Sequence, residues 1–160
     1  MADYFSHKRR VEFSETDSAG IAHFSSFMIY MEQAEHAFLR HLGLGVFADQ
    51  GNGWHLSWPR VHVECDYKGS AKFEDELDIQ VSVLKLGRKS LTYQFAFHKE
   101  GQQIGLGKTV AVCCRVKQGE PLESVAIPTS FSDALSPFLA TSPPDKSPQP
   151  SNPQLSNTDK

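Results

Sequence analysis

Four segments of this chain alternate apolar and polar residues with the two-residue period of β-strands that bury one face. They occupy residues 61–67, 77–83, 91–97 and 104–116. The last segment contains Gly105 and Gly107, where we expect an irregularity in the strand. The connections at residues 86–89 and 99–102 are short enough for hairpin turns. The pattern therefore predicts antiparallel strands whose shared apolar face must be covered by another element.

Residues 24–42 can supply that cover. Their apolar side chains recur at three- and four-residue steps, which is typical of a helix with one buried stripe. Ser25 or Ser26 can cap the start of this helix, and Gly43 marks its end. A further strand is expected at residues 9–13, so the order is strand, helix and four strands. We therefore predict an α+β domain.

The segment between the first strand and the helix carries the best candidate for chemistry. The strand places Val11 and Phe13 on one side and leads directly into a turn that holds Asp17. A carboxylate near the first turn of a helix lies beside unpaired backbone N–H groups, which can stabilise negative charge on a reacting oxygen. This segment could therefore supply both a base or nucleophile and an oxyanion site. The structural alternative is that Asp17 only caps a turn.

Composition limits the classes of protein to consider. The 160 residues fit one globular domain at 1–138, followed by a Pro-, Ser- and Asn-rich tail at 139–160 that is predicted to be disordered. A net charge of −3 gives no bulk attraction to nucleic acid or to an acidic membrane surface. No apolar run suits a bilayer span or a secretory signal, so we expect a cytoplasmic protein with reduced cysteines.

Several motifs occur in an order that resembles one known family. They are 11–13 with Thr16, Asp17, Gly20 and Ile21, then 30–34, Leu42 with Gly43, 61–67, 73–77, 87–90, and Ile127 with Pro128. In this combination the chain is similar to the hotdog-fold acyl-CoA thioesterases of the 4-hydroxybenzoyl-CoA thioesterase type. The resemblance covers roughly residues 8 to 130, and an ordered set of motifs is more specific than any single one.

The resemblance implies a long central helix wrapped by a curved antiparallel sheet of about five strands. It also implies that protomers pair sheet edge to sheet edge, with active sites at that boundary. A homodimer is then the minimal unit, and a homotetramer is expected. The implied activity is hydrolysis of acyl-CoA thioesters to a free acid and coenzyme A. No cofactor is expected, because the coenzyme A moiety belongs to the substrate, and neither nucleic acid nor membrane is an expected partner.

The same resemblance implies roles for the turn residues. Asp17 is the implied catalytic carboxylate, acting as nucleophile on the thioester carbonyl or as base for an attacking water. The backbone N–H of Phe24 matches the oxyanion donor, and Gly20 lets the chain turn closely beneath the thioester. His23 is a candidate to polarise the substrate or to tune Asp17, with a packed or solvated histidine as the alternative.

The phosphates of coenzyme A need a local basic patch in a protein of net negative charge. Arg88 and Lys89 are the best candidates, because the resemblance places them in its nucleotide-contacting hairpin turn. Ser90 beside them is a possible hydroxyl donor. The alternative is a solvated turn that only favours solubility.

Two other groups of polar residues invite different chemistry. Glu35 stands where the family often has Arg, and we interpret Glu32 and Glu35 as two solvated carboxylates rather than an acid-base pair. His62, Glu64 and Asp66 share one face of a predicted strand. Because same-face side chains on a strand are widely spaced, one shared ion is awkward there, and we expect no metal.

Two other functions on the same fold are the alternatives. A noncatalytic acyl-CoA or acyl-carrier binding module would keep the cleft without turnover. A hydratase or dehydratase would need a differently placed histidine and acid pair, which the sequence does not show. Walls for an acyl or aryl pocket could come from Phe27, Met31, Trp54 and Trp58, although most of these are expected in the core.

Overall fold

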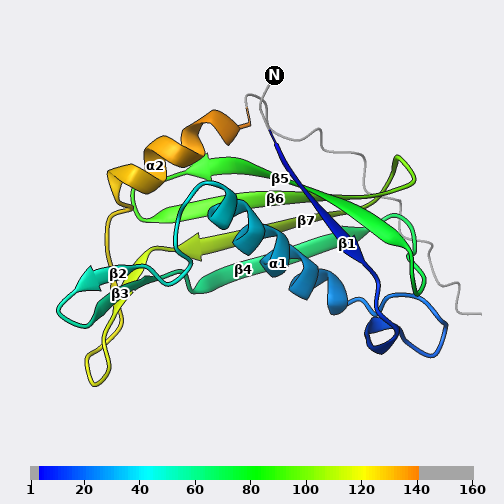
Figure 1. The fold of residues 1–160 in the computed structure, drawn as a ribbon, viewed down its shortest axis with the longest axis horizontal. Coiled ribbons are helices and arrows are strands. Elements are labelled where there is room, and N and C mark those ends of the chain that lie inside the picture. The colour runs from blue at the N-terminus through cyan, green and yellow to red at the C-terminus, as the bar shows by residue number, and fades with distance from the viewer. Residues whose placement is uncertain (1–3, 141–160) are drawn as a thin grey trace, which may run out of the picture.

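A five-stranded antiparallel sheet curves around the long helix α1 in the computed structural model, which describes residues 4–140 (Figure 1). The strand order is β1-β5-β6-β7-β4, so β1 and β4 are the edges of the sheet. This arrangement confirms the expected α+β hotdog fold. The bounds are α1 Ser26–His41, β1 Phe5–Arg10, β4 Arg60–Tyr67, β5 Glu76–Leu86, β6 Ser90–Lys99 and β7 Gln102–Val112.

Burial of one sheet face against α1 explains the alternating segments. Along β5 and β6 nearly every second side chain is buried in the core that α1 completes. Gly107 on β7 lies beneath α1, where a Cβ atom would collide with the sulfur of Met31. This glycine therefore lets the helix approach the sheet closely. The stripe of α1 that meets the sheet is Phe27, Met31, Ala34 and Phe38.

The last predicted strand is interrupted rather than continuous. The register between β6 and β7 shifts between Phe97 and His98, opposite Gly105, which confirms the irregularity expected there. β7 then ends at Val112, and the chain continues into a second sheet of order β2-β3-β8-β9. This small sheet extends from one end of the molecule (Figure 1), and the alternating pattern did not predict it. Its strands are β2 Asp49–Gly51, β3 Trp54–Ser57, β8 Cys114–Val116 and β9 Glu123–Ser124.

The prediction of a strand over residues 9–13 is wrong at its end. β1 stops earlier, and Phe13 begins the 3₁₀ turn η1 (Phe13–Glu15). A capping box stabilises this turn, since the Glu12 N–H donates to the Glu15 carboxylate at 2.8 Å. Val11 is therefore buried, whereas Phe13 projects into solvent.

The two ends of α1 differ in how well they follow the prediction. Ser25 occupies the N-cap position, but its side chain makes no capping hydrogen bond. The Ser26 hydroxyl donates instead to the carbonyl oxygen of Glu15 at 3.0 Å. At the other end, Gly43 adopts a φ of +72°, which is the left-handed conformation expected for a helix stop.

A short C-terminal element completes the domain. It consists of α2 (Thr129–Leu135) and η2 (Ser136–Phe138), and its Phe131 is buried. The tail predicted at 139–160 lies mostly outside the described residues. None of the helices between residues 4 and 140 is long and apolar enough to cross a membrane. All three cysteines are free thiols.

Candidate active site

Asp17 lies in a tight loop that the chain closes on itself. The Asp17 N–H donates to the Ile21 carbonyl oxygen at 2.9 Å, and Gly20 between them adopts a φ of +76°, which side chains disfavour. Oδ1 of Asp17 accepts the Ala19 N–H at 2.8 Å. Oδ1 therefore caps the loop, while Oδ2 takes part in no hydrogen bond within residues 4–140. The side chain is half-buried, and Oδ2 is the oxygen that these loop hydrogen bonds leave available for chemistry.

Glu15 fixes this loop to the start of α1. Its carbonyl oxygen accepts the His23 N–H at 2.8 Å and the Ser26 hydroxyl at 3.0 Å. Its carboxylate accepts the Tyr30 hydroxyl at 2.7 Å and forms an ion pair with Arg9. Burial, followed by the bond to Glu15, raises the pKa of Tyr30 well above its usual range, so this hydroxyl stays a donor. Sequence reasoning missed both Glu15 and Tyr30 as supports of the loop.

Phe24 lies in the turn just ahead of α1. Its backbone N–H has no acceptor in the described part of the chain, and its side chain is 64% exposed. The Phe24 carbonyl oxygen accepts the Tyr67 hydroxyl at 2.8 Å, which ties the start of the helix to edge strand β4. An unpaired N–H at the positive end of a helix suits a developing oxyanion. His23 beside it is engaged elsewhere, since its Nδ1 lies 2.7 Å from the Ser25 hydroxyl.

The basic turn lies at the other end of the sheet from this loop. Arg88, Lys89 and Ser90 join β5 to β6, whereas the Asp17 loop follows β1, which pairs with the start of β5 (Figure 1). The strand between these two points is roughly 33 Å long at the usual rise per residue. The ammonium group of Lys89 lies 3.2 Å from the carbonyl oxygen of Ser124, and Arg88 is exposed. One protomer therefore does not bring the basic turn to Asp17.

Edge strand β4 presents uncovered apolar side chains. Val61 is 63% exposed, and Val63 and Tyr67 are exposed as well. We call these three residues the β4 edge patch. The sequence predicted this apolar face to be buried, but α1 packs more closely on β1 and β5 than on β4 and leaves these side chains of β4 exposed. An apolar edge strand with unpaired backbone groups is a surface that another chain can pair with.

The interpretation of Glu35 as a solvated carboxylate is wrong. Its side chain is 2% exposed, and its Oε2 lies 2.6 Å from a guanidinium nitrogen of Arg60. The register of β4 against β7 shifts between Arg60 and His62, so Val61 forms a bulge. The bulge sets Arg60 opposite buried Ala111 on the inner face. Strict alternation would have left Arg60 on the outer face with His62.

The Glu35–Arg60 pair makes a titratable group in the core. Burial raises the pKa of Glu35 to about 7, while the charge and hydrogen bond of Arg60 oppose the rise. Burial, and then the negative charge of Glu35, raises the pKa of Tyr93 beside it. Glu35 lies ~13 Å along the helix axis from the start of α1. The pair is therefore separate from the Asp17 loop.

The outer face of the sheet carries a chain of hydrogen-bonded polar side chains on β4 and β7. Nε2 of His62 lies 2.7 Å from one carboxylate oxygen of Glu64, and Lys108 lies 2.5 Å from the other. These contacts lower the pKa of Glu64, chiefly through the hydrogen bond from Lys108. No cluster of three or more His, Cys, Asp or Glu in residues 4–140 is arranged to hold a metal ion.

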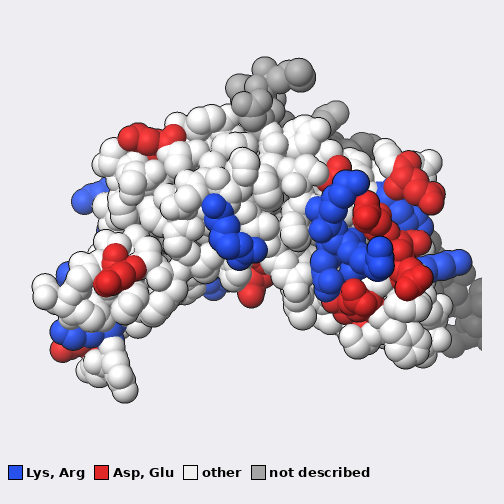
Figure 2. All heavy atoms as spheres, viewed as in Figure 1, with Lys and Arg blue, Asp and Glu red and all other residues white. Residues whose placement is uncertain are grey.

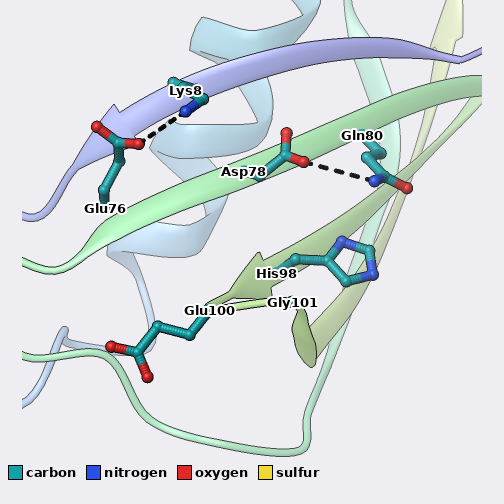
Figure 3. A pocket seen from close by; sticks show the side chains of 7 residues that line it. All are labelled: Lys8, Glu76, Asp78, Gln80, His98, Glu100 and Gly101. Carbon is teal, nitrogen blue, oxygen red and sulfur yellow. Dashed lines mark hydrogen bonds and ion pairs between the residues drawn. The ribbon is translucent and has the colours of Figure 1, made fainter.

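A polar groove of about 410 Å³ lies on the same outer face, between β1, β5 and the end of β6 (Figure 3). Lys8 pairs with Glu76 at 3.0 Å, and Gln80 donates to Asp78 at 3.5 Å. Glu100 adds a further carboxylate to the lining. Because its acids exceed its bases, this groove disfavours a ligand that carries phosphates.

The expected pocket walls lie mostly in the core. Phe27, Met31 and Trp58 are buried among the sheet and helix side chains. Trp54 belongs to the small second sheet, where the guanidinium carbon of Arg115 lies 4.6 Å from its ring centroid. None of these aromatic contacts involves the Asp17 loop.

The family model of the thioesterase-like superfamily matches residues 11–135 of the chain. The chain belongs to the thioesterase-like superfamily. A relative from Aquifex aeolicus, provisionally named an esterase, is 30% identical over 131 residues, which cover 82% of this chain and 97% of the relative. A 1,4-dihydroxy-2-naphthoyl-CoA hydrolase of Synechococcus elongatus is 28% identical over 127 residues, covering 76% of this chain and 90% of the relative. The structure of a gentisyl-coenzyme A thioesterase superposes with a TM-score of 0.69 and 26% identity, covering 82% of this chain and 99% of that one.

Membership of the thioesterase-like superfamily supports thioester hydrolysis as the class of reaction. It confirms the resemblance at the level of the superfamily, while the narrower 4-hydroxybenzoyl-CoA type stays a prediction. The roles of Asp17, Gly20, His23 and Phe24 stay predictions as well, and so do those of the basic turn. The loop geometry nevertheless places a carboxylate oxygen and a free amide in one short segment.

Proposed function

We propose that this member of the thioesterase-like superfamily hydrolyses acyl-CoA thioesters, with Asp17 as nucleophile or general base and the Phe24 N–H as oxyanion donor. One observation carries the proposal. Among residues 4–140 the loop occupies Oδ1 of Asp17 and leaves Oδ2 without a hydrogen bond, directly ahead of a helix start whose Phe24 N–H also has no acceptor there. A relative named as a naphthoyl-CoA hydrolase supports the choice of a coenzyme A ester.

Two reaction routes through Asp17 account for every bond formed and broken. In the first, the carboxylate oxygen attacks the thioester carbonyl carbon, the carbonyl oxygen gains negative charge at the Phe24 N–H, and the thiolate of coenzyme A leaves. Water then hydrolyses the acyl-aspartyl anhydride to the free acid. In the second, Asp17 accepts a proton from water as the water attacks, and that proton passes to the departing thiolate. Neither route needs a cofactor, because coenzyme A belongs to the substrate.

A homodimer that pairs through β4 would join the separated parts of the site. Antiparallel pairing of β4 with the same strand of a second copy sets opposite ends of the two sheets side by side. The basic turn of one protomer, with Arg88, Lys89 and Ser90, would then approach the Asp17 loop of its partner. The exposed β4 edge patch supports this arrangement. The proposal includes a homotetramer built from two such dimers and a cytoplasmic setting, where free thiols stay reduced.

A thiol-release assay with aromatic and aliphatic acyl-CoA esters tests the function. We expect release of free coenzyme A from at least one aromatic ester, since two similar proteins are named for aromatic coenzyme A substrates. The alternative is a noncatalytic acyl-CoA or acyl-carrier binding module. Tight binding of several esters without thiol release would favour that module and reject the hydrolase.

Replacing Val63 with Lys tests the proposed dimer. The side chain is exposed in one protomer, so the single chain should tolerate lysine, but a charge in the β4 edge patch should prevent edge pairing. We expect a monomer by light scattering and a loss of thioesterase activity of about tenfold or more, on the scale of a misplaced catalytic group. Leu122→Lys is the matched control, because Leu122 is also an exposed apolar residue but lies outside β4. A Val63→Lys monomer with unchanged activity would remove the need for a shared site.

A further inference from the structure

A second cavity, shallow and open to solvent, lies between α1 and edge strand β1, at the sheet edge opposite β4. Its volume is about 280 Å³. Three of its lining residues recur at three- and four-residue steps and so form one stripe on α1. The fourth, His7, faces this stripe from β1. The lining residues are His7, Gln33, His36 and Arg40. The proposed hydrolysis uses none of them.

Every side chain that lines this cavity can donate a hydrogen bond, and none is a carboxylate. Arg40 carries a permanent positive charge, and each imidazole gains one when it is protonated. Figure 2 shows a small basic spot over the C-terminal half of α1, with a small acidic spot just below it and mostly uncharged surface around both. In a protein with a net charge of −3, such a lining is a local feature and not a consequence of overall composition.

The charges around His7 come from both elements that pack beside it. Burial lowers the pKa of His7, and the positive charges of Arg9 and Arg40 lower it further. Arg9 forms an ion pair with Glu15, so its charge is partly offset. His7 is therefore biased toward the neutral form in a field that favours a negative ligand.

His36 sits in a similar field on α1. Burial lowers its pKa, Glu32 opposes this change, and the charges of Arg60 and Arg40 add to it. Arg60 is paired with Glu35, which leaves Arg40 as the cation that lines the cavity. An anion at this position would compensate the repulsion between Arg40 and a protonated His36.

We propose that this cavity is a binding site for a small oxyanion, a carboxylate or a phosphate, held by Arg40 together with protonated His7 and His36. The planar guanidinium of arginine matches either oxyanion with two parallel hydrogen bonds. The cavity is small and open, so it suits a small anion that keeps part of its surface in water. Because the two imidazoles gain protons as the anion binds, affinity should rise as pH falls. The site is independent of the proposed hydrolysis.

Isothermal titration of the full-length protein with benzoate, benzamide and inorganic phosphate tests the site. We expect benzoate or phosphate to bind and neutral benzamide, which has nearly the same shape as benzoate, not to bind. Benzoate, whose own charge does not change in this range, should bind at least about tenfold tighter at pH 6 than at pH 8, with proton uptake seen as a dependence on the buffer's ionisation enthalpy. Binding of benzoate alone identifies a carboxylate site, and binding of phosphate alone identifies a phosphate site. Equal binding of benzoate and benzamide, binding without proton uptake, or no binding of either anion would overturn the proposal.

Variants separate this site from the Asp17 loop, which could also bind a carboxylate. Arg40→Gln is expected to weaken binding by about tenfold or more, on the scale of a lost charge-assisted hydrogen bond. His36→Gln should reduce the proton uptake. Arg10→Gln is the matched control, because Arg10 is an exposed arginine of β1 that does not line the cavity. Asp17→Asn should leave binding unchanged. If Asp17→Asn abolished binding while Arg40→Gln preserved it, the anion would belong to the Asp17 loop and the proposal would fail.

Discussion

Replacing Asp17 with Asn is expected to lower kcat for acyl-CoA hydrolysis by at least about 10²-fold, the lower end of the range for general acid-base catalysis. The side-chain oxygen of asparagine can still accept the Ala19 N–H that now bonds to Oδ1 at 2.8 Å, so the loop should persist. The neutral amide, however, can neither attack a thioester carbonyl nor accept a proton from water. This substitution therefore separates the chemistry of the carboxylate from its capping role.

Asp49 supplies a matched control for that experiment. Its Oδ1 accepts the Gly51 N–H at 2.8 Å, which is the same two-residue step that joins Asp17 to Ala19. We expect Asp49→Asn to leave kcat unchanged, and thermal unfolding to show both variants folded. Steady-state thiol release provides the comparison. If both variants hydrolysed the best substrate at the rate of the unsubstituted protein, Asp17 would be only a turn cap.

Periodic patterns in the sequence predicted the helices and strands that bury one face against the core. The helical spacing from Phe24 to Leu42 and the alternation in β5 and β6 both report which side of an element meets the core. The patterns did not predict two features of the fold, because alternation carries no signal for an inserted residue or for a change of sheet. The bulge at Val61 reverses the side on which Arg60 lies, and the break at Cys113 sends the chain into the second sheet.

The candidate site was predictable only where it is local in sequence. Asp17 and Phe24 fall in one short segment, so their nearness follows from the chain itself. The Glu15–Tyr30 hydrogen bond and the Tyr67–Phe24 hydrogen bond join residues that only the folded sheet and helix bring together. The proposed approach of Arg88 to the Asp17 loop would require a second copy of the chain, and no periodicity within one sequence specifies such a pairing.

Replacing Arg60 with Met is expected to lower the free energy of unfolding by about 3–5 kcal/mol at pH 8, because it leaves a buried charge without its partner. Methionine retains a long apolar side chain, so the change removes the guanidinium more than the packing. Arg115→Met is the control, since Arg115 pairs with Glu123 at 2.5 Å on the exposed surface of the second sheet. Loss of this exposed pair, together with the contact of Arg115 on the Trp54 ring, should change the same free energy by no more than about 2 kcal/mol.

The pH dependence of that loss identifies its cause. Burial raises the pKa of Glu35 to about 7, above the ordinary value of 4.5, so the folded state holds more protons than the unfolded state between these values. Stability from this group therefore falls as pH rises through that window, and removing Arg60 should deepen the fall. Urea unfolding at pH 5.5 and pH 8 should show a smaller loss for Arg60→Met at the lower pH, where Glu35 is protonated. Adding Glu35→Gln should recover most of the loss at pH 8, because no charge then stays buried. A loss that is equal at both pH values and persists in the double variant would instead trace to the packing of β4 against α1.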